Sequence, residues 1–167
     1  MKIEHLDERI QDYNASIETV LNKKIYWQNT TKQILKDTLN RITTMFEIGW
    51  KVQELSWLNS NEAINITFHS IPANLREKSN LLPSYQFIQG CSLVFSQSYN
   101  GEVHIFILFP LIENLQDENN TINLGIYDPD EITDTLIVEK VDVFLKEVIN
   151  WEVPIEQKKL GFISEKS

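Results

Sequence analysis

The chain has 167 residues, of which 42% are hydrophobic, and a formal net charge of −9. This length and apolar content suffice for one substantial core, so we expect a single domain over residues 1–154, followed by a polar tail at 155–167 whose composition favours disorder. Residues 1–84 carry ten acidic and ten basic side chains, whereas residues 85–167 carry fourteen acidic side chains and five lysines. Such an acidic half repels a phosphate backbone, which argues against direct nucleic-acid binding.

The cysteine count and the hydropathy pattern indicate in which cellular compartment the protein is expected. A single cysteine, Cys91, excludes an intramolecular disulfide and a multi-cysteine metal site, and it is typical of the reducing cytoplasm. No apolar run has the length of a membrane span, and residues 1–8 become acidic too early for a secretory signal. We therefore expect a cytoplasmic protein that contacts no membrane and holds no metal or cofactor.

Residues 1–48 contain neither glycine nor proline and carry two apolar stripes of helical spacing. The first stripe steps by three and four residues in turn, which is the heptad spacing of helices that pair with other helices. It consists of Ile3, Leu6, Ile10, Tyr13, Ile17 and Val20. The second consists of Leu35, Leu39, Ile42 and Phe46. Thr30 and Gln33 lie between them with the spacing of a capping box, so we predict two antiparallel helices joined near residues 23–30, with one long helix as the alternative.

Strand signals follow Gly49. Residues 50–57 and 64–68 alternate between apolar and polar side chains and are separated by a polar loop, which predicts a β-hairpin, and a break in the alternation at Glu54 indicates a bulge. The connection 71–89 is long and apolar, which is typical of a lid or docking segment lying over the sheet.

The sequence predicts a second hairpin over residues 91–109 and also the register in which its two strands pair. A three-residue loop at 99–101 places Cys91, Leu93 and Phe95 on the same face as their partners, which are Phe109, Ile107 and Ile105. A two-residue loop would mix polar and apolar side chains on both faces, so burial favours the first register. Its turn requires one residue at positive φ, which Gly101 can adopt without a Cβ penalty.

The end of the chain completes the predicted fold. Residues 122–126 alternate like a short fifth strand, and the run Asp128-Pro129-Asp130-Glu131 has the composition of a helix N-terminus, predicting a final helix over 128–153. Strands and helices are segregated along the chain, which is typical of α+β proteins. We predict a four- or five-stranded antiparallel sheet packed by an N-terminal helical pair and a C-terminal helix.

The sequence contains no recognisable catalytic constellation. Its glycines are isolated, so there is no glycine-rich phosphate loop, and it has neither a nucleophile elbow nor a zinc-binding helix motif. The spacing of acidic residues after Asp128 departs from that of a calcium-binding loop, and helix capping is sufficient to explain it. We therefore assign no catalytic or metal-binding residue, and the pattern favours a protein without catalysis of its own.

Three hypotheses for function follow. The first is a protein-interaction module, such as an inhibitor, an immunity or antitoxin-like protein, or an accessory subunit, which contacts a basic partner through an acidic patch. The patch consists of Glu113, Asp117, Glu118, Asp128, Asp130, Glu131 and Asp134. The second is a ligand-binding or enzymatic domain with a pocket between the sheet and residues 71–89. That pocket would present His69, Arg76, Tyr85 and His104. The third is an oligomer that pairs through Ile3, Leu6, Ile10, Tyr13 and Ile17, although burial within the same chain is the commoner fate of such a stripe.

Overall fold

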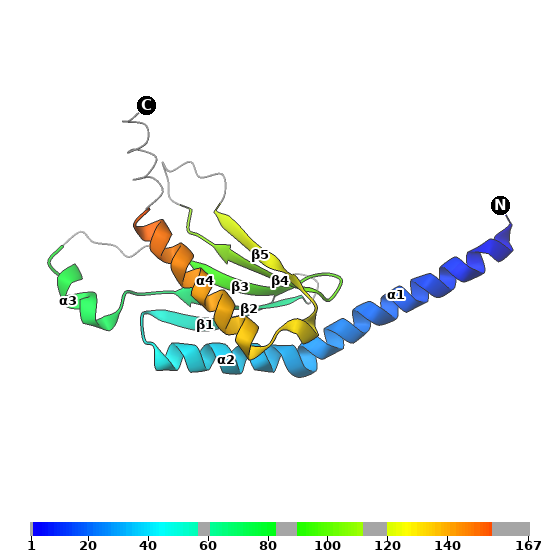
Figure 1. Ribbon diagram of the computed structural model, residues 1–167, viewed down its shortest axis with the longest axis horizontal. Coiled ribbons are helices and arrows are strands. Elements are labelled where there is room, and N and C mark those ends of the chain that lie inside the picture. The colour runs from blue at the N-terminus through cyan, green and yellow to red at the C-terminus, as the bar shows by residue number, and fades with distance from the viewer. Residues whose placement is uncertain (1, 57–60, 83–89, 112–119, 155–167) are drawn as a thin grey trace, which may run out of the picture.

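The computed structural model describes residues 2–56, 61–82, 90–111 and 120–154. A five-stranded antiparallel sheet lies at the centre, and helices α2 (Lys32–Met45) and α4 (Asp134–Glu152) pack on it. Helix α1 (Leu6–Tyr26) projects away from this body as a long arm (Figure 1). The α+β class predicted from the sequence is confirmed.

The five strands follow one another in the sheet in chain order, β1-β2-β3-β4-β5. They are β1 (Trp50–Ser56), β2 (Glu62–Phe68), β3 (Ser92–Gln97), β4 (Val103–Leu108) and β5 (Thr121–Tyr127). The predicted bulge at Glu54 is wrong, because Glu54 pairs with Ile64 inside an uninterrupted β1–β2 register. Glu54 occupies an apolar position of the alternation because its carboxylate has lysine partners on α2. The register shifts instead between β4 and β5, beside Ile105.

The register predicted for the β3–β4 hairpin is confirmed. Leu93 pairs with Ile107 and Phe95 with Ile105. The turn closes with a hydrogen bond of 2.8 Å from the Ser98 amide to the Glu102 carbonyl, and Gly101 adopts a φ of +86°. Burial of the apolar face selected this pairing, as the alternation of side chains indicated.

The core lies between one face of the sheet and the two packed helices. The second apolar stripe of the N-terminal segment supplies the fully buried Leu35 and Leu39 from α2. Helix α4 contributes Phe144, whose ring lies 5.7 Å from that of Phe68, which in turn stacks on Trp50 at 5.6 Å. The body is thus held by contacts among α2, α4 and the sheet, without α1.

The favoured prediction of two antiparallel N-terminal helices is wrong, and the alternative of one long helix is confirmed. Helix α1, a π-helical turn η2 (Trp27–Thr31) and α2 form one continuous helix, and Thr31 has helical dihedral angles of −60° and −45°. The capping box does not form, because the Gln33 side chain donates to Asp37 at 2.7 Å instead. Trp27 and Thr31 are buried against the body, and that packing stabilises the helix through the segment where the sequence predicted a break.

The final helix also begins later than predicted. Asp128 opens a short 3-10 turn, η5 (Pro129–Glu131), and α4 starts at Asp134 with the Thr133 hydroxyl accepting from the Leu136 amide at 3.2 Å. The capping residues were recognised correctly, but they belong to the turn and not to the helix. Among the helices in the described residues, none combines the length and apolarity required to cross a membrane.

Candidate interaction surface on helix α1

Helix α1 exposes an apolar stripe along its whole length. None of its 21 residues is buried. The stripe, named the α1 seam below, consists of Ile3, from the turn before the helix, Leu6, Ile10, Tyr13, Ile17, Leu21 and Ile25. The exposed fractions run from 42% at Ile17 to 83% at Ile3. Single exposed apolar side chains are common on protein surfaces, whereas a contiguous apolar row of this kind marks an interaction site.

The last turns of α1 rest on the β3–β4 turn, and this contact orients the seam. A Cβ placed on Gly101 would lie 2.7 Å from the Lys23 Cβ and 3.2 Å from the Val20 carbonyl oxygen. Val20, which the heptad pattern assigned to the seam, is therefore half-buried beside the turn. The exposed row continues through Leu21 and Ile25 instead, by steps of four residues. The seam thus lies on a different side of the helix from the residues that touch the body.

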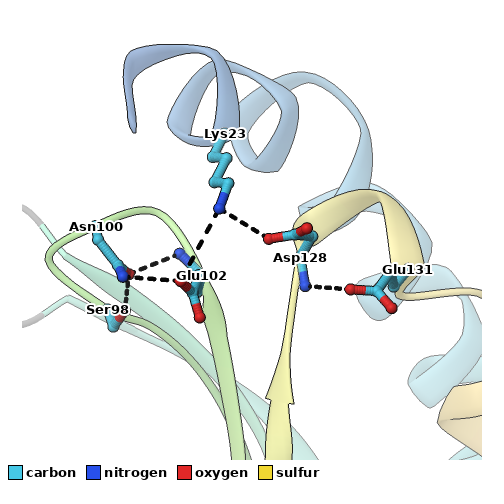
Figure 2. A network of polar contacts seen from close by, with 6 residues as sticks. All are labelled: Lys23, Ser98, Asn100, Glu102, Asp128 and Glu131. Carbon is cyan, nitrogen blue, oxygen red and sulfur yellow. Dashed lines mark hydrogen bonds and ion pairs between the residues drawn. The ribbon is translucent and has the colours of Figure 1, made fainter. Parts of the chain in front are cut away.

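Lys23 fastens the base of α1 to two other elements (Figure 2). Its ammonium lies 2.9 Å from the Asp128 carboxylate and 3.9 Å from the Glu102 carboxylate. The hydrogen bond to Asp128, followed by the negative charges of Asp128 and Glu102, raises the pKa of Lys23 above its ordinary value. Glu102 is held in turn by Asn100, whose side-chain amide donates to it at 2.9 Å. These contacts join the helix to the hairpin turn and to η5.

The buried Thr31 makes the second attachment of this region. Its hydroxyl donates to the Pro129 carbonyl oxygen at 2.8 Å. The π-helical turn that contains Thr31 holds one residue more than a regular turn, which rotates the following helix by roughly 100° relative to an uninterrupted one. Because of this rotation the stripe of α2 faces the sheet while the α1 seam points elsewhere.

A lysine cluster attaches α2 to the first hairpin. Lys32 lies 2.7 Å from Glu62 and 3.0 Å from Glu54, and Lys36 lies 3.3 Å from Glu54. The hydrogen bonds to Glu62 and Glu54 raise the pKa of Lys32, and the hydrogen bond from Lys32 lowers the pKa of Glu54. The cluster is partly solvated, so we assign it a structural role in docking the helix.

The predicted acidic patch is only partly within the described residues. Glu113, Asp117 and Glu118 lie outside them. The Asp128 carboxylate pairs with Lys23, and the Glu131 carboxylate accepts from the Asp128 amide at 2.8 Å. Asp134 accepts from the Thr135 amide at 2.8 Å, and Asp130 is exposed. Three of these four described carboxylates thus have partners within the chain. The number of charges in the sequence could not indicate these contacts.

Three of the four residues of the predicted ligand pocket lie in the described part of the chain. The sheet does not pair its two histidines, because His104 is aligned through Ser96 with Ala63, six residues before His69. His69 and Arg76 are exposed, Tyr85 lies outside the described residues, and His104 is half-buried with its ring nitrogen 2.9 Å from the Asn123 carboxamide oxygen. A cleft of about 300 Å³ lies elsewhere, between α1 and η5. It is lined by Thr19, Asn22, Lys23, Tyr26, Asp128, Pro129 and Asp130. Within the ranges that the structure covers, no group of three His, Cys, Asp or Glu residues is arranged to hold a metal ion.

Comparisons with known proteins add no functional information: no family model, curated protein or solved structure matches the chain. The functional inference therefore rests on the geometry of the chain itself. Heptad spacing predicted the first five residues of the seam correctly, but it then assigned Val20 and missed Leu21 and Ile25. The sequence could not indicate this, because Val20 is half-buried beside Gly101, a residue far away in the chain.

Proposed function

We propose that this protein is a protein-interaction module that self-associates through helix α1, so that the α1 seam of one copy covers that of another. The observation that carries the proposal is a 21-residue helix that buries none of its own side chains and yet carries a continuous apolar row. The helix measures about 32 Å, enough for a short coiled coil.

The continuity of α1 with the folded body makes it suited to binding. A short isolated helix is only marginally stable in water because its nucleation is costly. Here α1 continues directly into α2, which is anchored by the buried Leu35 and Leu39, so the folded body supplies the nucleus. The arm is therefore formed before a partner arrives, which reduces the entropy lost on association.

The acidic patch has less support as the main contact. Lys23 already pairs with Asp128, and the Glu131 and Asp134 carboxylates serve backbone amides. A carboxylate that caps or pairs within its own chain gains less from an external cation than a free one does. The α1 seam, in contrast, has no partner among the described residues, as the exposure of its side chains shows.

Sedimentation equilibrium over a range of concentrations tests the proposal. With barely three heptads of seam, we expect a monomer–dimer equilibrium with a Kd in the micromolar range. The substitution Ile10→Asp buries an unpaired charge at the interface and should raise Kd by at least about 100-fold. Ala15→Asp is the matched control, because residue 15 lies on the opposite side of the same exposed helix.

Circular dichroism should show the same helix content for both variants, since neither residue is buried. A wild-type chain that remains monomeric at about 200 μM would contradict the proposal, because a heptad seam that functions in pairing should associate at that concentration. Equal dimerisation of the Ile10→Asp variant and the wild-type chain would contradict it as well.

A further inference from the structure

We infer that the ion pairs of Lys23 form a tether that fixes the direction of the α1 arm, and that the arm pivots at the π-helical turn when this tether is released. The Lys23 tether consists of the contacts of its ammonium with Asp128 at 2.9 Å and with Glu102 at 3.9 Å. The inference concerns the single chain, so it does not depend on the proposed self-association. Only its consequence for a dimer does.

The long helix is least regular directly after Lys23. The Trp27 amide is shared between the carbonyl oxygens of Lys23 and Lys24. The Lys32 amide bonds to the Trp27 carbonyl oxygen, five residues back. Sharp bends in long helices concentrate at proline, at pairs of small residues and at π-helical turns. Residues 1–48 contain neither proline nor glycine, so the π turn is where we expect the helix to bend.

Two different kinds of contact hold the base of α1. On the hairpin side, close packing against Gly101 stops the helix from moving further toward the β3–β4 turn, but packing attracts only weakly once the surfaces separate. On the other side, Lys23 of α1 and Asp128 at the start of η5 both line the cleft of about 300 Å³. Their ion pair joins the two walls of that cleft, and it therefore opposes motion of the arm away from the body.

Both carboxylates of the tether are held by their own elements (Figure 2). The Asn100 side chain donates to Glu102 at 2.9 Å, and the Ser98 hydroxyl donates to the Asn100 side chain at 2.6 Å. The Asp128 amide donates to the Glu131 carboxylate at 2.8 Å. The loss of the Lys23 ammonium should thus free the arm without disturbing either turn.

The length of the arm converts a small rotation into a large displacement. Ile3 lies 24 residues before Trp27, which is roughly 36 Å along a helix. A bend of about 20° at the π turn therefore moves this end by about 12 Å. The tether is partly exposed, with 26% of the Lys23 side chain and 48% of the Asp128 side chain accessible, so salt screens it. The direction of the arm, and in a dimer the placement of the two bodies, should respond to ionic strength.

Distances between two spin labels on one chain, measured by double electron–electron resonance, test the tether. One label is attached at Ala15→Cys on the arm and the other at Glu139→Cys on α4, because both sites are exposed and the native Cys91 is buried. The labelled chains carry Ile10→Asp and are diluted with unlabelled chains, so that only distances within one chain contribute.

Lys23→Met removes the charge and keeps most of the alkyl stem. Lys24→Met is the matched control, because Lys24 is the adjacent half-buried lysine and is not part of the tether. A partly exposed ion pair changes a population by up to about fivefold. We therefore expect the fraction of chains outside the main distance peak to rise by about fivefold in Lys23→Met and to remain at the wild-type value in Lys24→Met.

Ionic strength and the second partner provide independent measurements. Raising NaCl from about 0.1 M to about 1 M should broaden the wild-type distribution toward that of Lys23→Met, which should itself change little. Asp128→Asn should broaden the distribution as well, and the double variant should broaden it no further than Lys23→Met alone. A Lys23→Met distribution equal to that of the wild-type chain would overturn the inference, as would equal broadening in Lys24→Met or additive broadening in the double variant.

Discussion

Replacing Gly101 by alanine tests whether the β3–β4 turn sets the position of α1. The φ of +86° costs a residue with a Cβ about 1–2 kcal/mol. The new methyl would also lie 2.7 Å from the Lys23 Cβ, which is far shorter than a normal carbon–carbon contact. Overpacking of that kind costs about 1–3 kcal/mol, so the total loss of unfolding free energy should be about 2–5 kcal/mol.

Urea unfolding followed by tryptophan fluorescence measures this loss, since Trp27 is buried directly after α1. Gly125→Ala is the matched control. Gly125 also has a positive φ, of +114°, but its Cβ would meet the side-chain ring of Tyr127 at 3.0 Å and not a helix backbone. We expect Gly101→Ala to cost clearly more than Gly125→Ala and to speed hydrogen exchange in the last turns of α1. Equal costs for the two variants would refute the claim that close packing against the helix matters.

Three further predictions concern the contacts that hold the arm and the body. Thr31→Val keeps the shape of the side chain but removes the shorter of two hydrogen bonds to the Pro129 carbonyl oxygen, which retains the Ile132 amide at 3.3 Å. The substitution should cost about 0.5–1.5 kcal/mol in urea unfolding, and an unchanged midpoint would contradict a stabilising role for the hydroxyl. Cys91 is 4% exposed and burial raises the pKa of its thiol to about 11, so a thiol reagent at pH 8 should react only as the chain unfolds; immediate labelling of the native protein would contradict this. Lys32 lowers the pKa of Glu54, so the contribution of the Glu54 carboxylate to stability is present above the ordinary value of 4.5 and is lost as the pH falls through the lowered pKa. The difference in unfolding free energy between the wild-type chain and Glu54→Gln should therefore shrink on acidification. A constant difference would contradict the pairing.

The hairpin register was predictable because its information is local. Alternation of side chains fixed the faces of β3 and β4, and Gly101 fixed the turn, so no distant contact was required. The helix break at residues 23–30 was predicted wrongly because capping residues are compatible with a helix end but do not by themselves end a helix. Whether the helix ends there depends on tertiary packing, and here Thr31 bonds to Pro129, 98 residues further along the chain. The use of Lys23 as an anchor for Asp128 and Glu102 was unpredictable for the same reason.

The two apolar stripes of the N-terminal segment have the same spacing but different environments, because α1 projects beyond the body whereas α2 lies against it (Figure 1). The π-helical turn between them sets the direction in which the stripe of α2 faces. On an uninterrupted helix of 3.6 residues per turn, Ile10, Ile17 and Leu35 would lie on one side and face in one direction. The extra residue at Trp27–Thr31 rotates α2, so that Leu35 faces the body and is fully buried. Ile17, on the projecting part of the helix, is 42% exposed. Strain in the hydrogen bonding of a π turn persists only where packing compensates for it, and the buried Trp27 and Thr31 provide that packing. The turn thus couples a stripe used for folding to a stripe left available for association, which is why we expect a variant that restores a regular helix there to misplace the α1 seam before it unfolds the sheet.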